Sequence, residues 1–116
     1  MAELSDRLAA INRLVHEPAR LVLLTALSAC QSADFLFLQR LTGLTPGNLS
    51  SHIARLEEAG LVLVDKQILS KRPNTRVALT EQGRKAVEAH WKQLEQLREQ
   101  AEEQAARSDN ETDLNR

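Results

Sequence analysis

Small polar side chains gather at the start of one segment whose pattern is helical. Thr45 and Pro46 are typical of a helix start, because a threonine caps free N–H groups and proline suits the first helical position. Leu49, Ile53 and Leu56 share one stripe of this helix and are expected to pack inward. The residues expected to point outward are Gly47, Asn48, Ser50 and Ser51, followed one turn later by Arg55.

These outward side chains suit contact with duplex DNA. Asparagine can pair with adenine through two hydrogen bonds, serine can donate to or accept from a base edge, and a helix N-terminus offers N–H groups to a phosphate. Short polar groups also let a helix approach the floor of the major groove. The expected DNA contacts on this helix are Thr45, Pro46, Gly47, Asn48, Ser50, Ser51 and Arg55. The alternative is a solvated helix whose asparagine and serines only cap it.

Basic side chains mark a polar turn between two strand-like runs. Lys71 and Arg72 lie at the expected tip, with Asn74 beside them and Arg76 across the strand pair. Such a loop can lie over a phosphate backbone, and an arginine at its tip can enter a narrow minor groove. The alternative is that these cations only protect an exposed strand edge from pairing.

The distribution of charge agrees with this reading better than the total does. The formal net charge is -1, but residues 40–85 hold eight basic and four acidic side chains, whereas residues 86–116 hold four basic and eight acidic ones. A basic middle beside an acidic end is the asymmetry expected of a chain that meets DNA with one part of its surface.

No catalytic or metal-binding pattern stands out in the sequence. His16, His52 and His90 lie on different expected elements at no ligand spacing, and Cys30 is the single cysteine. There is no Ser-His-Asp pattern, no carboxylate pair and no glycine-rich phosphate loop. We therefore expect no enzymatic activity, no cofactor and no metal. No apolar run is long enough for a bilayer and the start lacks a signal peptide, so we expect a cytoplasmic protein.

The remaining signals predict a mainly α fold with a two-stranded β wing, in the order of a winged helix-turn-helix. We expect helices over residues 4–15, 18–29, 34–42 and 45–59, a hairpin over residues 61–79 and a last helix from residue 80. Residues 31–34 are expected to form a turn. The domain should occupy residues 1–106, followed by a disordered polar tail at 107–116.

Two apolar stripes flank this core, one in the first helix and one in the last. A helix that is apolar on one side needs a partner, so we expect these N- and C-terminal helices to form the interface of a homodimer. The expected interface residues are Leu4, Leu8, Ile11, Val15, His90, Trp91, Leu94, Leu97 and Ala101. The alternative is that the two stripes pack only on each other within one chain.

Several strings in the sequence resemble the MarR/ArsR-like winged-helix regulators, and among them a short single-domain winged-helix branch. The strings are residues 17–20 through 34–35, residues 44–53, residues 56–62, and residues 72–75 with 79–84. The resemblance implies a homodimer, a recognition helix at Pro46–Ala59 and a DNA-contacting wing at Ser70–Thr75. The paired cysteines of the ArsR metal signature are absent, so metal sensing is not implied. The chain is shorter than a typical MarR protein, so the resemblance does not decide whether the usual ligand pocket is present or whether a small-molecule effector binds.

Together these observations predict a transcription regulator that acts as a repressor by binding a palindromic duplex site as a homodimer. The alternative is a winged-helix module that binds other proteins and has no affinity for DNA.

Overall fold

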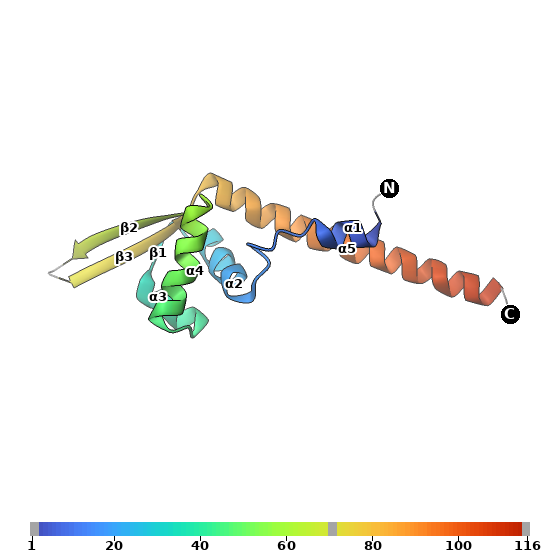
Figure 1. Ribbon diagram of the computed structural model, residues 1–116, viewed down its shortest axis with the longest axis horizontal. Coiled ribbons are helices and arrows are strands. Elements are labelled where there is room, and N and C mark those ends of the chain that lie inside the picture. Colours follow the sequence, from blue (N-terminus) through green and yellow to red (C-terminus); the bar gives the residue numbers. More distant parts are fainter. Residues whose placement is uncertain (1–2, 70–71, 115–116) are drawn as a thin grey trace.

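The structure is a computed structural model that describes residues 3–69 and 72–114, with the side chains of residues 68–73 and 111–116 left out of the description. A small body of helices and strands carries two extensions (Figure 1). The hairpin extends to one side and the last helix to the other, which gives a molecule of 75 × 25 × 21 Å. The elements are α1 (Leu4–Ala9), α2 (Pro18–Ser28), β1 (Ala33–Asp34), α3 (Phe35–Thr42), α4 (Pro46–Glu58), β2 (Val62–Leu69), β3 (Arg72–Leu79) and α5 (Glu81–Leu114).

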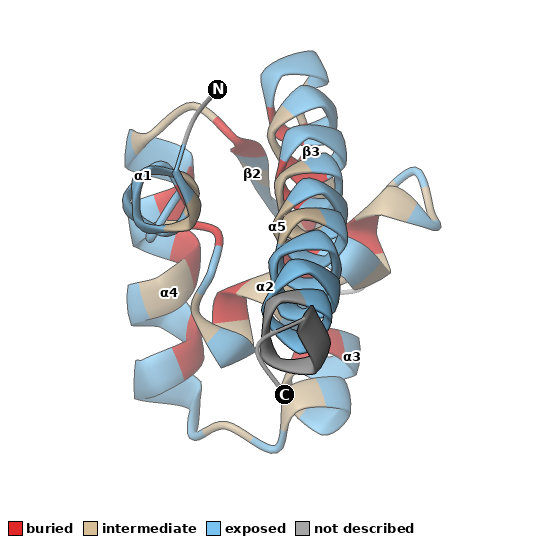
Figure 2. Cartoon of the chain, turned by 90° about the vertical axis from the view of Figure 1, so that its right-hand side faces the viewer, coloured by how far each residue is buried: buried red, intermediate tan, exposed pale blue. Residues whose placement is uncertain are grey.

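The core lies between α2, α3, α4 and the root of the sheet. Each leucine buried there contributes about 1.5–3 kcal/mol relative to exposure, so this cluster is the main source of stability. Its fully buried leucines are Leu23, Leu24, Leu27, Leu38, Leu49 and Leu56. In Figure 2 the buried residues of α4 lie on the side that faces α2, and its outer side is exposed.

Local capping signals set the boundaries of the helix-turn-helix. The Asp34 side chain accepts a hydrogen bond from the Phe37 N–H at 2.7 Å and so caps α3. Gly43 ends that helix with a φ of 69°, in the left-handed region that glycine enters without strain. The Thr45 hydroxyl then accepts from the Asn48 N–H and caps α4. The helix start predicted at Thr45 is confirmed, and Asp34 and Gly43 lie at the bounds predicted for the helix over residues 34–42.

The sheet has three strands in the order β1-β3-β2, where the sequence predicted two. Residues 31–34 were expected to form a turn, but β1 pairs antiparallel with β3 through Ala33 opposite Val77 and Asp34 opposite Arg76. A strand of two residues has no periodicity to detect, and it forms because Ala33 is buried against the core. The β3 strand begins at Arg72, a residue that was expected to lie in the polar turn.

The prediction of one helix over residues 4–15 was wrong. The helix α1 ends at Ala9, and the Asn12 carboxamide oxygen then accepts hydrogen bonds from the N–H groups of Leu14 and Val15. An asparagine that bonds its own backbone in this way competes with the helix. As a result Ile11 and Val15 do not continue a stripe with Leu4 and Leu8 but turn into the body, where Val15 is fully buried.

The last helix is longer than the sequence predicted, since α5 continues to Leu114 where a disordered tail was expected from residue 107. Ion pairs one turn apart support this exposed stretch, among them Arg107 with Glu103 at 2.5 Å and Arg98 with Glu95 at 2.7 Å. The first helix contacts α5, and Arg7 of α1 donates to the Gln96 side chain at 3.3 Å.

One polar residue of α5 is buried in the body. His90 has no exposed surface, and its Nε2 lies 3.4 Å from Nδ1 of His16. Its own Nδ1 has no hydrogen-bond partner among the described residues. Burial lowers the pKa of His90 below the ordinary 6.5, and the nearby His16 lowers it further.

This lowered pKa predicts a loss of stability in acid. Below about pH 6.5 the unfolded chain binds a proton at residue 90 that the folded chain does not, so the free energy of unfolding falls as the pH falls. We expect a His90→Gln variant, which cannot titrate there, to lose less free energy of unfolding than the wild type between pH 7.5 and 5.5. One proton can account for a slope of at most about 1.4 kcal/mol per pH unit. Denaturant titrations of both proteins measure the two slopes, and equal slopes would contradict the assignment.

Candidate nucleic-acid interface

The outer side of α4 is exposed along its whole length. The buried residues Leu49, Ile53 and Leu56 hold the helix on the body. Every residue of this helix and its cap that the sequence assigned to DNA contact is exposed: Thr45, Pro46, Gly47, Asn48, Ser50, Ser51 and Arg55. The structure therefore brings these residues together on one open face, whose side chains are short near the helix N-terminus.

A groove joins α4 to the hairpin. It has a volume of about 450 Å³, and its walls include Ser50, Ala54 and Glu57 from α4 together with Lys66 and Thr75 from the hairpin. The last two residues are opposite each other in the β2–β3 register. The face of α4 and the hairpin thus form a continuous surface that carries hydroxyl groups and both signs of charge.

Sequence reasoning did not assign the residues that join the two parts of this surface. Lys66 and Ala54 were not among the expected contacts, although both are exposed beside residues that were. Alternation along β2 could have indicated Lys66, because every second side chain of a strand points to the same face. The contribution of Ala54 depends on how close the hairpin lies, which the sequence does not show.

Of the cations expected at the wing, the structure describes the side chain of Arg76. Lys71 lies outside the described residues, and Arg72 is described only as the backbone start of β3. Arg76 lies nearer the root of the hairpin, where its Nε donates to the Ser32 hydroxyl at 2.9 Å and its Nη2 to the Ser32 carbonyl at 3.3 Å. Arg76 thus holds the segment before β1 through Ser32, and the grouping of all three cations on one loop stays a prediction. Asn74 is half-buried and pairs in register with Gln67.

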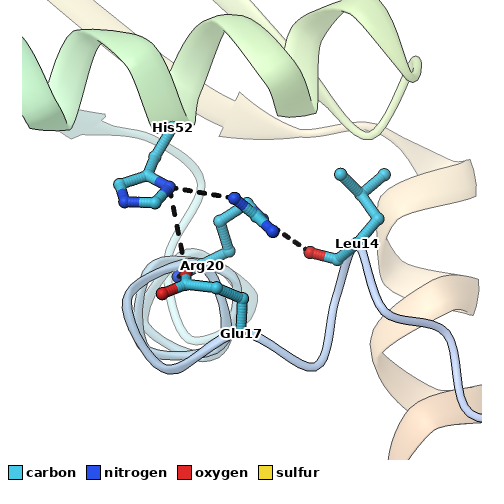
Figure 3. A network of polar contacts seen from close by, with 4 residues as sticks. All are labelled: Leu14, Glu17, Arg20 and His52. Atoms are coloured by element: carbon cyan, nitrogen blue, oxygen red, sulfur yellow. Dashed lines mark hydrogen bonds and ion pairs between the residues drawn. The ribbon is translucent and has the colours of Figure 1, made fainter.

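A polar cluster holds the other flank of α4 (Figure 3). Arg20 of α2 is almost fully buried, and its Nε donates to the Leu14 carbonyl at 2.7 Å while its Nη1 lies 3.1 Å from Nδ1 of His52 on α4. The Glu17 carboxylate accepts from the Arg20 N–H at 2.8 Å and lies 3.8 Å from the same His52 nitrogen. Sequence reasoning assigned no role to this cluster, since its only signal was a charged residue within an apolar helix.

The charges around Glu17 determine its protonation. Partial burial alone raises the pKa of this carboxyl, but the N–H donors of Arg20 and Ala19 together with the nearby His52 and Arg20 side chains lower it by more. Glu17 is therefore a carboxylate at neutral pH, and it caps α2 in that form.

The residues expected at a dimer interface fall into two groups. Ile11, Val15 and His90 are buried within the chain, so their side chains are not available to a partner in this arrangement. Leu8 and Ala101 are exposed, Trp91 is 47% exposed, and Leu4, Leu94 and Leu97 are half-buried. The first and last helices thus pack on each other in part and still leave apolar surface uncovered.

Among the described residues there is no group of three or more side chains placed to hold a metal ion, and none of their helices could cross a membrane. An apolar hollow of about 400 Å³ is lined by Trp91 of α5, Val22 of α2 and Leu41 of α3, among others. Trp91, which was expected at the dimer interface, is one of the residues that line this hollow.

Comparisons with known proteins agree with the geometry. The sequence profile described as a winged helix DNA-binding domain matches residues 19–98. An uncharacterized protein of Methanocaldococcus jannaschii is 29% identical over 85 residues, which are 73% of this chain and 92% of that protein.

Solved structures are similar as well. A transcriptional regulator homologue from Pyrococcus horikoshii superposes with a TM-score of 0.74 and 33% identity, covering 85% of this chain and 96% of that one. The transcriptional repressor CouR, bound to a 23-mer DNA duplex, shares the fold with a TM-score of 0.67 and 21% identity over 96% of this chain and 78% of its own. Other neighbours are regulators of the MarR and ArsR families, which confirms the resemblance inferred from the sequence.

Proposed function

The chain belongs to the winged helix DNA-binding domain family, and its structural neighbours are MarR- and ArsR-family transcription regulators. We propose that it binds a palindromic duplex site as a homodimer and represses transcription by occupying that site. The observation that carries the proposal is the open face of α4. Its short polar side chains are all exposed around a capped helix N-terminus.

In this proposal α4 lies in the major groove and supplies the base contacts. Asn48 and Arg55 are the two exposed side chains of the face that can make paired hydrogen bonds with a base. Asparagine prefers adenine and arginine prefers guanine, because each offers a matching pair of donors and acceptors. Thr45, Ser50 and Ser51 are expected to reach phosphates or base edges, and the backbone N–H of Gly47, which has no acceptor within the helix at this position, lies at the same end of α4.

The hairpin supplies phosphate contacts in this proposal. Lys66 lines the groove beside α4, and the sequence places Lys71 and Arg72 at the tip. Each phosphate that a cation neutralises releases counterions, which strengthens binding to any sequence and makes it depend on salt. Arg76 is expected to contribute through the position of the hairpin root, because its guanidinium is bonded to Ser32.

A homodimer is supported by the apolar surface that one chain leaves open. Leu8, Trp91 and the half-buried Leu94 and Leu97 lie on α1 and α5, away from the α4 face. Two-fold pairing through these helices would set two α4 helices apart on the same side of the dimer. A palindromic site then follows, because each half of the site meets an identical helix.

The base contacts predict a selective loss of affinity. Asn48→Ala and Arg55→Ala should each lower affinity for the duplex that the wild type selects from a random pool by about 1–3 kcal/mol. Affinity for a mixed-sequence duplex should change much less, since phosphate contacts carry it. Fluorescence anisotropy with both duplexes at one salt concentration measures the two losses. Equal losses on both duplexes would assign these residues to phosphate contact and contradict the proposed reading of bases.

The dimer interface predicts a charge-sensitive assembly. Leu94→Glu with Leu97→Glu places two charges in the proposed seam, where a buried unpaired charge is costly. We expect this variant to sediment as a monomer and to bind the selected duplex much more weakly, because linked half-sites gain from effective concentration. The control is Ala89→Glu with Lys92→Glu, which adds two glutamates at exposed positions of the same helix. A wild type that sediments as a monomer at tens of micromolar would rule the dimer out.

A further inference from the structure

A charged residue, Arg20, is buried in the body of the domain, where an apolar side chain would cost less free energy of hydration. Arg20 is 8% exposed, and its side chain reaches the segment before α2 as well as the helix α4. It joins the carbonyl of Leu14, in the segment between α1 and α2, to Nδ1 of His52 on α4. Burying a guanidinium costs several kcal/mol of hydration, which hydrogen bonds of good geometry offset only in part. An apolar side chain of similar size would fill the space without that cost, so stability does not account for an arginine here.

The contact lies on a particular flank of α4. Successive residues of an α-helix are separated by about 100°, which puts His52 beside the buried stripe of Leu49 and Ile53 on the flank opposite to Ser50. Ser50 lines the groove beside the hairpin, whereas the Arg20 contact to His52 comes from α2 (Figure 3). The helix is thus held between the hairpin on one flank and Arg20 on the other.

The two proposed base-reading residues are the neighbours of His52 on this flank. Asn48 lies four residues before His52 and Arg55 three residues after it, and side chains at these spacings are adjacent on a helix surface. The apolar contacts of Leu49, Ile53 and Leu56 keep α4 on the body but have little directional preference. A hydrogen bond depends on angle and distance, so the Arg20 contact adds an angular restraint that the leucines do not supply.

We propose that Arg20, through its hydrogen bond to His52, is a positioning residue for DNA recognition that fixes the rotation of α4 and thereby the aim of Asn48 and Arg55. The Leu14 carbonyl holds the other end of the guanidinium, and Glu17 keeps the start of α2 in place through the Arg20 N–H. The inference rests on the proposed function, because it concerns the geometry with which α4 meets bases.

The test compares two substitutions of the partly exposed partner. His52→Asn keeps an acceptor oxygen close to the position of Nδ1, whereas His52→Leu keeps the bulk and removes the acceptor. We expect His52→Leu to lower affinity for the duplex selected by the wild type by roughly tenfold, the loss of about one hydrogen bond to a charged group. His52→Asn should stay within about threefold of the wild type, and both should bind a mixed-sequence duplex within about twofold of it.

A second variant reports on the arginine itself. Arg20→Met should reduce the selectivity for the selected duplex as His52→Leu does, and the double variant should lose no more than either single one, because both remove the same contact. Thermal unfolding of each variant identifies changes in the fold. If Arg20→Met does not fold, the two His52 variants still decide the matter, since the His52 side chain is partly exposed.

The outcomes separate this inference from the proposed function. If the wild type selects a duplex and His52→Leu binds that duplex with the same affinity, the positioning role is overturned and the proposed function stands. Equal losses for His52→Leu and His52→Asn would also overturn it, because the acceptor would then not matter. A wild type that selects no duplex would overturn the proposed function and the positioning role together.

Discussion

The burial of Leu49, Ile53 and Leu56 against the body decides what α4 can do, because it determines which side of that helix is left to solvent. Once that stripe is buried, Asn48, Ser51 and Arg55 have no place but the outer face. The hairpin follows α4 after a single turn at Gly60, where a φ of 78° reverses the chain, so the second part of the surface is placed by the same packing. The composition of α4 alone does not make it an interface; the direction in which its apolar stripe is buried does.

Features that depend on neighbours in sequence were predictable. The caps at Asp34 and Thr45 and the left-handed Gly43 are local, since each is decided by a side chain within three or four residues of the group that it satisfies. The exposed face of α4 was predictable for the same reason, because the apolar stripe of Leu49, Ile53 and Leu56 is buried and the opposite side of the helix is then exposed.

Features that depend on distant contacts were not predictable. The strand β1 depends on Val77 and Arg76, which lie beside it, and the bonding of Arg76 to Ser32 depends on a residue more than forty positions earlier in the chain. Nothing near Arg20 in the sequence indicates His52 as its partner. The first helix ends early for a local reason, the hydrogen bonds of the Asn12 side chain. The helical spacing of the apolar residues on both sides of Asn12 nevertheless favoured one continuous helix. Ion pairs within the helix support the polar end of α5. The low hydrophobicity of that stretch had favoured a disordered tail instead.

The central claim is that the α4 face and the hairpin form one DNA-binding surface. The most direct measurement is a titration of the isotope-labelled 13.0 kDa chain with a mixed-sequence duplex, followed by the backbone amide signals in NMR spectra. The account predicts that the largest shifts fall on residues 45–55 and on the hairpin from residue 66 to residue 75, and that they shrink as salt is added. Shifts confined to α5, or no shifts at low salt, would contradict it.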